Sequence, residues 1–405
     1  MKRAFTLHRT LGRAVAGFLV FVLLTGSLAA ISIDVEALVE RGGSTSLTTE
    51  ALDAFEAAER ARGETVFRVM LPASERGAWA LVRLDDGTFE RATLNEDGTV
   101  RARLPPTGAV QALRDIHRAL LLGHVGLYFV TPISILLLAL LITGLLSQRR
   151  FIWKPQGIQH EARLSSWHRM LGTYAFVPGL LFATTGVFYI AETVVEDAGG
   201  SLEVEPPHGA ASDESCDPCM TLSAVMRLVH DESPHLSPRE LAFSRDGNVL
   251  TVFGPGRAPL VRDIGSYVVV DRREGRVLGA HEASASHPLD LTADVVDTLH
   301  FGRFGGSFVR ALWCLFGLAL VGLAASGWMR AIGREGFQRE AVVLLVLLLG
   351  LVTRGVFRSW SELAPSGFIA LGLLLFSAVA TLALVAGTQR KSAAARGSSR
   401  TNVNQ

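Results

Sequence analysis

The sequence predicts a mainly α-helical integral membrane protein with a duplicated four-helix core, an extra C-terminal helix pair and two small α+β domains outside the membrane. Three observations predict this fold. The apolar residues are concentrated in runs of about 20, the length at which a helix crosses a bilayer. Basic residues flank these runs on alternate sides. Histidine-containing motifs recur in the same order in the two halves of the 405-residue chain.

The apolar runs place six transmembrane helices. They cover residues 14–33, 125–146, 170–190, 308–329, 341–357 and 368–388. The first run lacks a small-x-small cleavage site and follows a histidine that recurs later, so we interpret it as a helix and not as a signal peptide. Arg354 interrupts the fifth run and must reach the interface or find a partner.

The charge pattern orients these spans. Clusters of arginine and lysine precede the first run, separate the second from the third, and follow the fourth and the sixth. By the positive-inside rule both termini are cytoplasmic, and residues 34–116 and 191–305 lie outside. The formal net charge of +1 says nothing about partners. The apolar spans imply a lipid bilayer as a partner, and no nucleic acid is expected.

These expectations divide the chain into successive segments. They are the N-terminus with the first span (1–33), an outer domain (34–116), the second span (117–146), an inner loop (147–169), the third span (170–190), an outer linker and domain (191–305), the fourth span (306–329), the fifth and sixth spans (341–357 and 368–388) and a disordered inner tail (389–405).

Both outer segments have the pattern of a small α+β unit. The first has helical spacing over 48–62, followed by strands at 65–71, 78–84 and 88–94 with a hairpin signal at Asp85-Asp86-Gly87. The second has a helix at 221–230 and strands at 240–244, 249–253, 266–271 and 276–280, separated by glycine-containing turns. Each unit is therefore a helix followed by an antiparallel meander.

The duplication is visible in short motifs around four histidines. Leu7-His8-Arg9 before the first span matches Trp167-His168-Arg169 before the third, and a Thr-Gly pair follows 17 and 18 residues after each histidine. Outside, an aliphatic residue followed by histidine recurs, as Ile116-His117 and Leu299-His300. A glycine lies six residues after each, and Thr143-Gly144 or Ser326-Gly327 follows 26 and 27 residues after. The repeated unit is helix, outer domain, helix.

The four recurring histidines suggest axial ligation of two b-type haems. His8 and His168 are expected at the inner edge of the membrane, and His117 and His300 at the outer edge. A pseudo-two-fold bundle would bring each pair face to face, and bis-histidine ligation gives a low-spin iron suited to electron transfer. His124, seven residues after His117, is an additional candidate ligand, although Ser307 replaces it in the second half.

Simpler interpretations stay open for each of these residues. A single interfacial histidine is most often a polar anchor, and it is the symmetry of four that favours haem. The glycines of the Thr-Gly and Ser-Gly pairs either make room for a porphyrin edge or let helices pack closely. Cys216 and Cys219 lie outside and are expected to form a disulfide or an exchanging dithiol, whereas Cys314 is a packing thiol. No histidine follows Cys219, so the haem would be non-covalent.

The histidine motifs resemble those of the PepSY-associated transmembrane family. The resemblance rests on the Leu-His-Arg motif before the first span, Ile116-His117 before a span that ends in Leu-x-Thr-Gly-Leu, and Trp-His-Arg-x-Leu-Gly before the third, and it runs from about residue 5 to 330. It implies that the outer units are periplasmic PepSY-like domains and that the protein lies in a bacterial inner membrane. Members include haem-containing reductases of ferric siderophores, and His8, His168, His117 and His300 would be the ligands. His124 and the extra helix pair depart from the family pattern.

Three functions follow as hypotheses. The first is a di-haem oxidoreductase that reduces a ferric siderophore or another ferric chelate in the periplasm and so releases Fe(II) for iron uptake. The second is a non-enzymatic PepSY module that binds and inhibits a periplasmic protease or acts as a sensor. The third is a thiol–disulfide relay through Cys216 and Cys219. Because no Gly-x-Gly-x-x-Gly motif follows a predicted strand, the electron donor must be separate, either a quinol or a cytoplasmic reductase.

Overall fold

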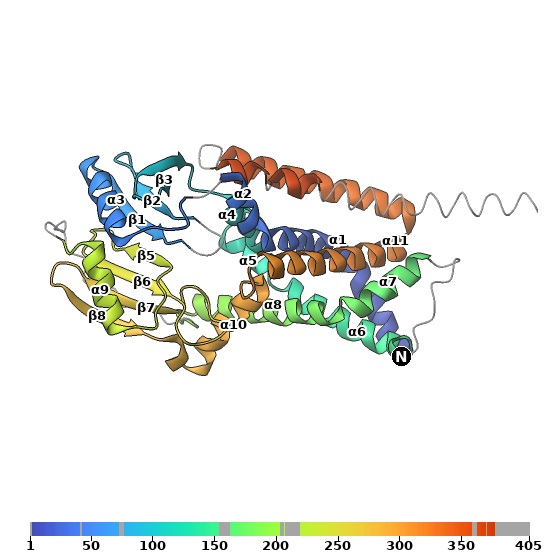
Figure 1. Cartoon of the computed structure of the whole chain (residues 1–405). Coiled ribbons are helices and arrows are strands. Elements are labelled where there is room, and N and C mark those ends of the chain that lie inside the picture. Colours follow the sequence, from blue (N-terminus) through green and yellow to red (C-terminus); the bar gives the residue numbers. More distant parts are fainter. Residues whose placement is uncertain are drawn as a thin grey trace, which may run out of the picture.

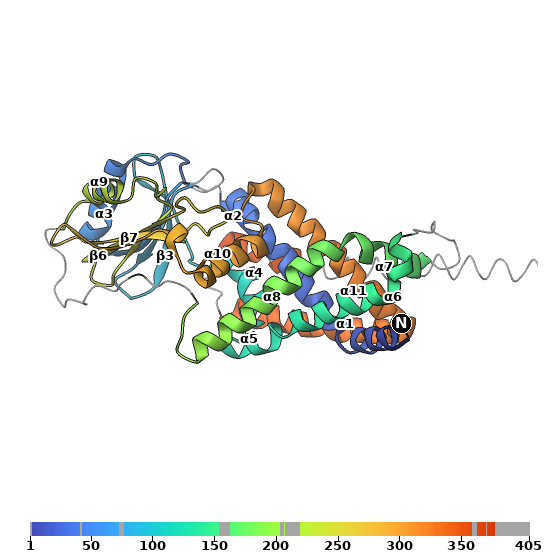
Figure 2. The ribbon, with the colours of Figure 1, turned by 90° about the horizontal axis from the view of Figure 1, so that it is seen from below.

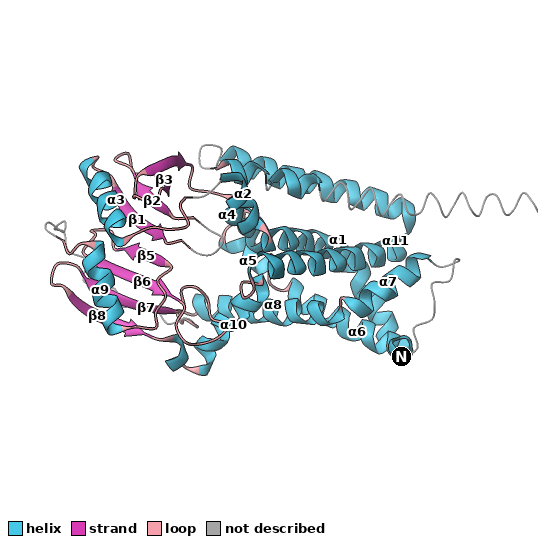
Figure 3. Ribbon diagram, in the orientation of Figure 1, coloured by secondary structure: helices cyan, strands magenta, loops and turns pink. Residues whose placement is uncertain are grey.

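The computed structural model describes residues 2–40, 43–72, 77–153, 163–202, 206, 219–358, 363–369 and 371–376. It has two parts, a bundle of long helices and a twisted antiparallel sheet at one end of that bundle (Figures 1 and 3). The N-terminus lies at the end of the bundle that is remote from the sheet (Figure 1).

Four helices within the described residues are long and apolar enough to cross a membrane. They are α1 (Lys2–Ala30), α5 and α6 together (His124–Val130 and Ile133–Trp153), α8 (Phe176–Asp197) and the part of α11 (Gly306–Arg358) before Gly333. Leu19, Leu24, Val321 and Trp328 belong to the buried core of this bundle, in which α1 packs against both α6 and α11.

The two C-terminal runs are described only in part. Residues 341–357 belong to a helix that follows the kink at Gly333 (φ 73°), where the helix of the fourth span ends, and this stretch is not among the four candidate spans in the described part of the chain. Of the sixth run, 368–376 belongs to a shorter apolar helix, Pro365–Phe376, and the remainder lies outside the described residues, as does the predicted tail. Ser366 Oγ accepts a hydrogen bond from the backbone of Ala109 at 3.0 Å, so this segment docks at the outer end of the bundle.

Short helices precede two of the spans and carry the outer histidines. His117 lies in the last turn of α4 (Ala109–Ala119), and His300 in the last turn of α10 (Pro288–Phe301). The sequence predicts that both histidines begin a span, but in the structure each lies in the short helix before it. The spans begin only at Gly123 and Gly306, whose φ values of 62° and 63° are favourable for glycine and turn the chain between helices. The remaining connections are α2 (Ser32–Glu40) and α7 (Arg163–Tyr174).

The extramembrane part is one eight-stranded antiparallel sheet with the order β4-β3-β2-β1-β5-β6-β7-β8. The strands are β1 (Thr65–Met70), β2 (Trp79–Arg83), β3 (Phe89–Leu94), β4 (Val100–Leu104), β5 (Glu240–Phe243), β6 (Val249–Gly254), β7 (Ser266–Asp271) and β8 (Arg276–His281). The prediction missed β4, in which two of the five residues are the arginines Arg101 and Arg103.

The two predicted outer domains share this single sheet and one core, which corrects the expectation of separate domains. Their first strands pair antiparallel at the centre, with Val69 opposite Leu241. The helices α3 (Thr49–Ala61) and α9 (Leu222–Glu232) lie side by side on one face of the sheet (Figures 1 and 2) and bury Phe55 and Val225 in the common core. The shared sheet leaves no exposed edge between the halves, and a free edge there would invite aggregation.

Candidate functional site

The structure brings the four recurring histidines together in two pairs. His8 of α1 faces His168 of α7, with ring centroids 6.2 Å apart. His117 of α4 faces His300 of α10, with ring centroids 6.4 Å apart. Each pair takes one residue from each half of the chain. α7 and the start of α1, which carry the first pair, lie at the end of the bundle that holds the N-terminus, and α4 and α10, which carry the second, lie beside the sheet (Figure 1).

Every one of these rings is held through its Nδ1 atom. The contacts, with one hydroxyl for each ring, are Thr143 Oγ1 and Leu140 O to His8 (3.2 and 3.0 Å), Ser326 Oγ and Leu323 O to His168 (3.0 and 3.1 Å), Thr25 Oγ1 and Val22 O to His117 (3.1 and 3.0 Å) and Thr185 Oγ1 to His300 (2.8 Å). A carbonyl oxygen can only accept, so Nδ1 of the first three rings donates. Nε2 then carries the lone pair, and a metal-binding histidine is held in the same way.

The glycines of the repeated Thr-Gly and Ser-Gly motifs make room for the imidazole rings. A Cβ atom on Gly26 would lie 2.7 Å from Cε1 of His117, and one on Gly327 would lie 2.9 Å from Cε1 of His168. On Gly144 it would lie 3.2 Å from Cε1 of His8. Gly186 instead faces Ser134, with a Cβ–Cβ distance of 2.7 Å. The motif therefore combines a hydroxyl that binds the ring with a glycine that admits it, a role of the hydroxyl that sequence reasoning missed.

A cavity of about 450 Å³ adjoins the outer pair. Its walls are largely apolar and include Leu19, Val22, Phe182 and Trp313. Several charged side chains also line it. The ring of Tyr189 stands edge-on to His300 with centroids 5.2 Å apart. A cavity of this size, with mostly apolar walls and a few convergent polar groups, is typical of a cofactor site.

The outer imidazoles are in the neutral form that binds metals. Burial lowers the pKa of His117 to about 4, and its hydrogen bond to the carbonyl of Val22 offsets this only in part. Burial and, to a smaller extent, the neighbouring His117 lower the pKa of His300 to about 4 as well. Both rings are therefore neutral at pH 7 and able to ligate through a ring nitrogen.

The spacing of the two pairs fits ligation from opposite sides of one metal ion. An imidazole nitrogen lies about 2 Å from a bound metal, which places the centroids of two opposed rings about 6 Å apart. The described residues contain no group of three or more His, Cys, Asp or Glu side chains that could hold a bare ion. Each pair could therefore supply two ligands to an iron, and a tetrapyrrole would have to supply the others. The residues present fit haem.

His124, the reserve ligand, lies apart from the cavity lining and has another contact. Its Nε2 atom pairs with Asp197 Oδ1 at 2.9 Å, and its side chain is 57% exposed. The corresponding residue of the second half, Ser307, donates to Asp34 Oδ1 at 2.6 Å. Both residues therefore join the start of one span to an acidic residue in the other half of the chain. This gives His124 a packing role without haem.

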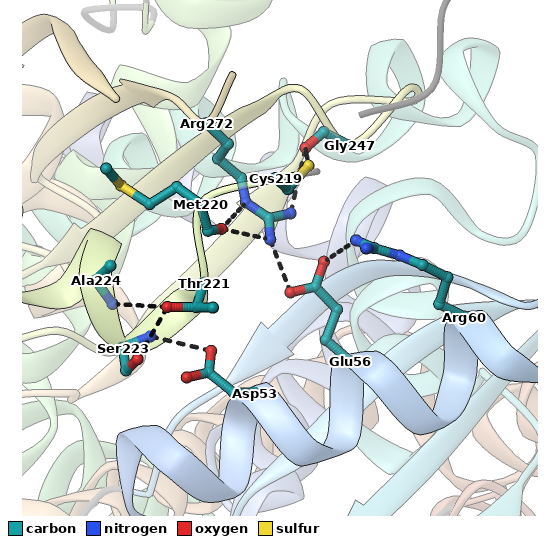
Figure 4. A network of polar contacts seen from close by, with 10 residues as sticks. All are labelled: Asp53, Glu56, Arg60, Cys219, Met220, Thr221, Ser223, Ala224, Gly247 and Arg272. Carbon is teal, nitrogen blue, oxygen red and sulfur yellow. Dashed lines mark hydrogen bonds and ion pairs between the residues drawn. The ribbon is translucent and has the colours of Figure 1, made fainter. Parts of the chain in front are cut away.

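Cys219 lies at the contact between the two halves of the sheet (Figure 4). It is disulfide-bonded, and Cys216 lies outside the described residues. The next residue, Met220, accepts hydrogen bonds through its carbonyl from Arg272, whose guanidinium is buried and donates to Glu56 of α3 at 2.8 Å (Figure 4). The disulfide thus adjoins a buried ion pair that connects the two halves.

Comparison with known families identifies one match. The family model described as the PepSY-associated TM region matches residues 5–334. No curated protein matches the chain.

Proposed function

Because the chain belongs to the PepSY-associated transmembrane family, we propose that it carries electrons across a membrane on two non-covalent b-type haems. The observation that supports this proposal is the pair of opposed imidazoles at each end of the bundle. His8 and His168 would hold one haem, and His117 and His300 the other. Each haem would supply an iron that accepts and releases one electron.

The side chains around each pair orient the ligands and exclude water. The carbonyl and hydroxyl acceptors at Nδ1 fix the tautomer of the ring and raise the basicity of the ligand. Around the outer pair, Phe182 and Trp313 keep the cavity wall apolar, and a dry apolar wall influences the potential of a buried haem. The histidines therefore depend on residues of all four spans for their position.

The spacing along α1 favours transfer in two steps. His8 and Thr25, which contacts His117, are 17 residues apart on this continuous helix. That separation is roughly 25 Å at 1.5 Å per residue. Two centres at opposite ends would divide a bilayer of about 30 Å into shorter distances.

The proposed acceptor is a ferric siderophore or another ferric chelate on the side of the sheet. Reduction of Fe(III) to Fe(II) takes one electron, supplied through a separate quinol or cytoplasmic reductase, and the Fe(II) released serves iron uptake. The alternating basic flanks favour an inner membrane location with the N-terminus cytoplasmic and the sheet in the periplasm. In this proposal the two halves arose by duplication, and the sheet is a joined pair of PepSY units.

The test is a dithionite-reduced minus oxidised visible spectrum of the purified protein, with haem counted by pyridine haemochrome. We expect about two low-spin haems for each chain, and loss of one after His8→Ala or His117→Ala. The outer replacement should leave the inner spectrum intact, because the pairs lie at opposite ends of the bundle. A colourless protein from haem-replete cells would refute the proposal and favour the non-enzymatic binding module.

A further inference from the structure

The two halves contribute opposite charges to the outer cavity at equivalent positions. Arg114 precedes His117 by three residues on α4, and Asp297 precedes His300 by three residues on α10. Residues three apart share a helix face, and both side chains line the cavity. The arrangement of the histidines is symmetric, but the electrostatic environment around them is not.

The charge difference extends beyond these two residues. The charged lining residues of the first half are Arg114 and Arg118, one helical turn apart. Those of the second half are Glu192, Glu196, Asp297 and Arg262. Arg262 is paired with Asp294, so it contributes little free positive charge. The cavity is therefore positive along α4 and negative along α8 and α10.

Asp297, the acidic counterpart of Arg114, is satisfied within the protein. Asp297 accepts a hydrogen bond from Tyr189 Oη at 3.1 Å and another from Arg303 Nη1 at 3.2 Å. These two contacts occupy both oxygens of the carboxylate. Asp297 therefore needs no ligand, and as an anion it would repel a second carboxylate.

The basic side has no such partners. Neither Arg114 nor Arg118 forms an ion pair or hydrogen bond with any described side chain, although Arg114 is half-buried. The adjacent Asp115 accepts from Gln111 Nε2 at 2.8 Å and makes no ion pair with either arginine in the described part of the chain. Arg114 and Arg118 both interact electrostatically with the carboxylate of Asp115, but neither guanidinium contacts it directly, and a bound carboxylate would supply the charge-assisted hydrogen bonds that they lack.

We propose that the outer cavity binds a carboxylate-bearing ligand in one orientation, with its carboxylates against Arg114 and Arg118. This inference rests on the proposed function, because the ligand nearest His117 and His300 would be a haem, whose propionates are carboxylates. The same arginines would suit the carboxylates of a ferric chelate at the mouth of the cavity. In either case the asymmetry between Arg114 and Asp297 selects one of two pseudo-symmetric orientations.

The experiment compares haem with haem dimethyl ester, which lacks the charges. Apoprotein carrying His8→Ala, in which the inner pair is disabled, is titrated with each and the bound fraction read from the Soret band. We expect haem to bind roughly 10- to 100-fold more tightly than the ester, as for other charge-assisted contacts. Arg114→Gln should bring the two affinities close together. Asp297→Asn, the matched replacement in the other half, should retain the preference.

A second arm distinguishes the source of the carboxylate. Ferric citrate is added to the haem-loaded wild-type protein and to its Arg114→Gln variant, and binding is followed by calorimetry. If the ester and haem bind equally but citrate binding depends on Arg114, the carboxylates that the arginines bind are those of a ferric chelate. If neither arm depends on Arg114, the orientation proposal is overturned while haem binding stands. If neither haem nor its dimethyl ester binds the wild-type protein, the proposed function is overturned as well.

If His8→Ala does not fold, competition on the otherwise wild-type chain makes the same comparison. Equal amounts of haem and ester are offered, and the bound ratio is measured after extraction. Excess haem in the wild-type and Asp297→Asn chains, lost in Arg114→Gln, supports the proposal. Equal ratios in all three chains refute it.

Discussion

Replacing Gly26 with alanine tests how the outer histidine is held. The new Cβ would lie 2.7 Å from Cε1 of His117 and 3.2 Å from both ring nitrogens. Carbon atoms pack best at about 3.5 Å or more, so the ring would have to move by about 0.8 Å. That shift would stretch its bonds to Thr25 and Val22, now 3.1 and 3.0 Å, beyond useful length.

The cost can be estimated from these contacts. Each lost hydrogen bond is worth about 1 kcal/mol, and overpacking adds about 1–3 kcal/mol. The contact with the ring therefore costs about 3–5 kcal/mol, and the gain of about 1 kcal/mol in helix propensity leaves a net destabilisation of about 2–4 kcal/mol for the native fold or its outer ligand set. The measurements are the midpoint of thermal unfolding and the number of low-spin haems for each chain, which should fall from about two towards one.

Gly12→Ala is the matched control on the same helix. A Cβ there would meet only Leu140 Cδ2 at 3.8 Å, an ordinary contact. Both replacements gain about 1 kcal/mol of helix propensity, so their difference reports the contact with His117 alone. If the Gly26→Ala protein is as stable and as haem-loaded as the Gly12→Ala protein, the reasoning about the ring contact is wrong.

Three further outcomes are expected. His124→Gln should keep both haems and shift thermal unfolding only slightly, because the side chain is largely exposed; loss of a haem would return it to the ligand set. Arg272→Ala should destabilise the sheet by about 2–3 kcal/mol in chemical denaturation, since it removes the buried guanidinium that joins Met220 O to Glu56, which keeps only its pair with the exposed Arg60, whereas Arg276→Ala removes an exposed pair and should cost less than about 1 kcal/mol. Ser326→Ala should weaken haem retention at the inner pair by roughly tenfold, because His168 loses one of its two Nδ1 contacts, and unchanged retention in a haem-transfer assay would contradict this.

The sequence alone predicted the four spans of the core and the recurrence of four histidines in the two halves of the chain. The length of an apolar run is a local property matched to the bilayer, and a repeated motif is visible without knowing where the chain folds. Seven of the eight strands were also predicted, because period-two alternation and glycine turns are local signals. The C-terminal pair stays a prediction, because residues 341–357 form a helix after the kink at Gly333 and most of the sixth run lies outside the described residues.

The tertiary structure alone decided how these pieces meet. The central strand pair joins Val69 to Leu241, and no local pattern reports pairing across such a separation. Three of the four rings are held by backbone carbonyls, those of Leu140, Val22 and Leu323, and every residue type has a carbonyl, so these contacts leave no trace in the sequence. The hydroxyls and glycines beside them did recur, but only the folded chain shows that they hold and admit an imidazole ring.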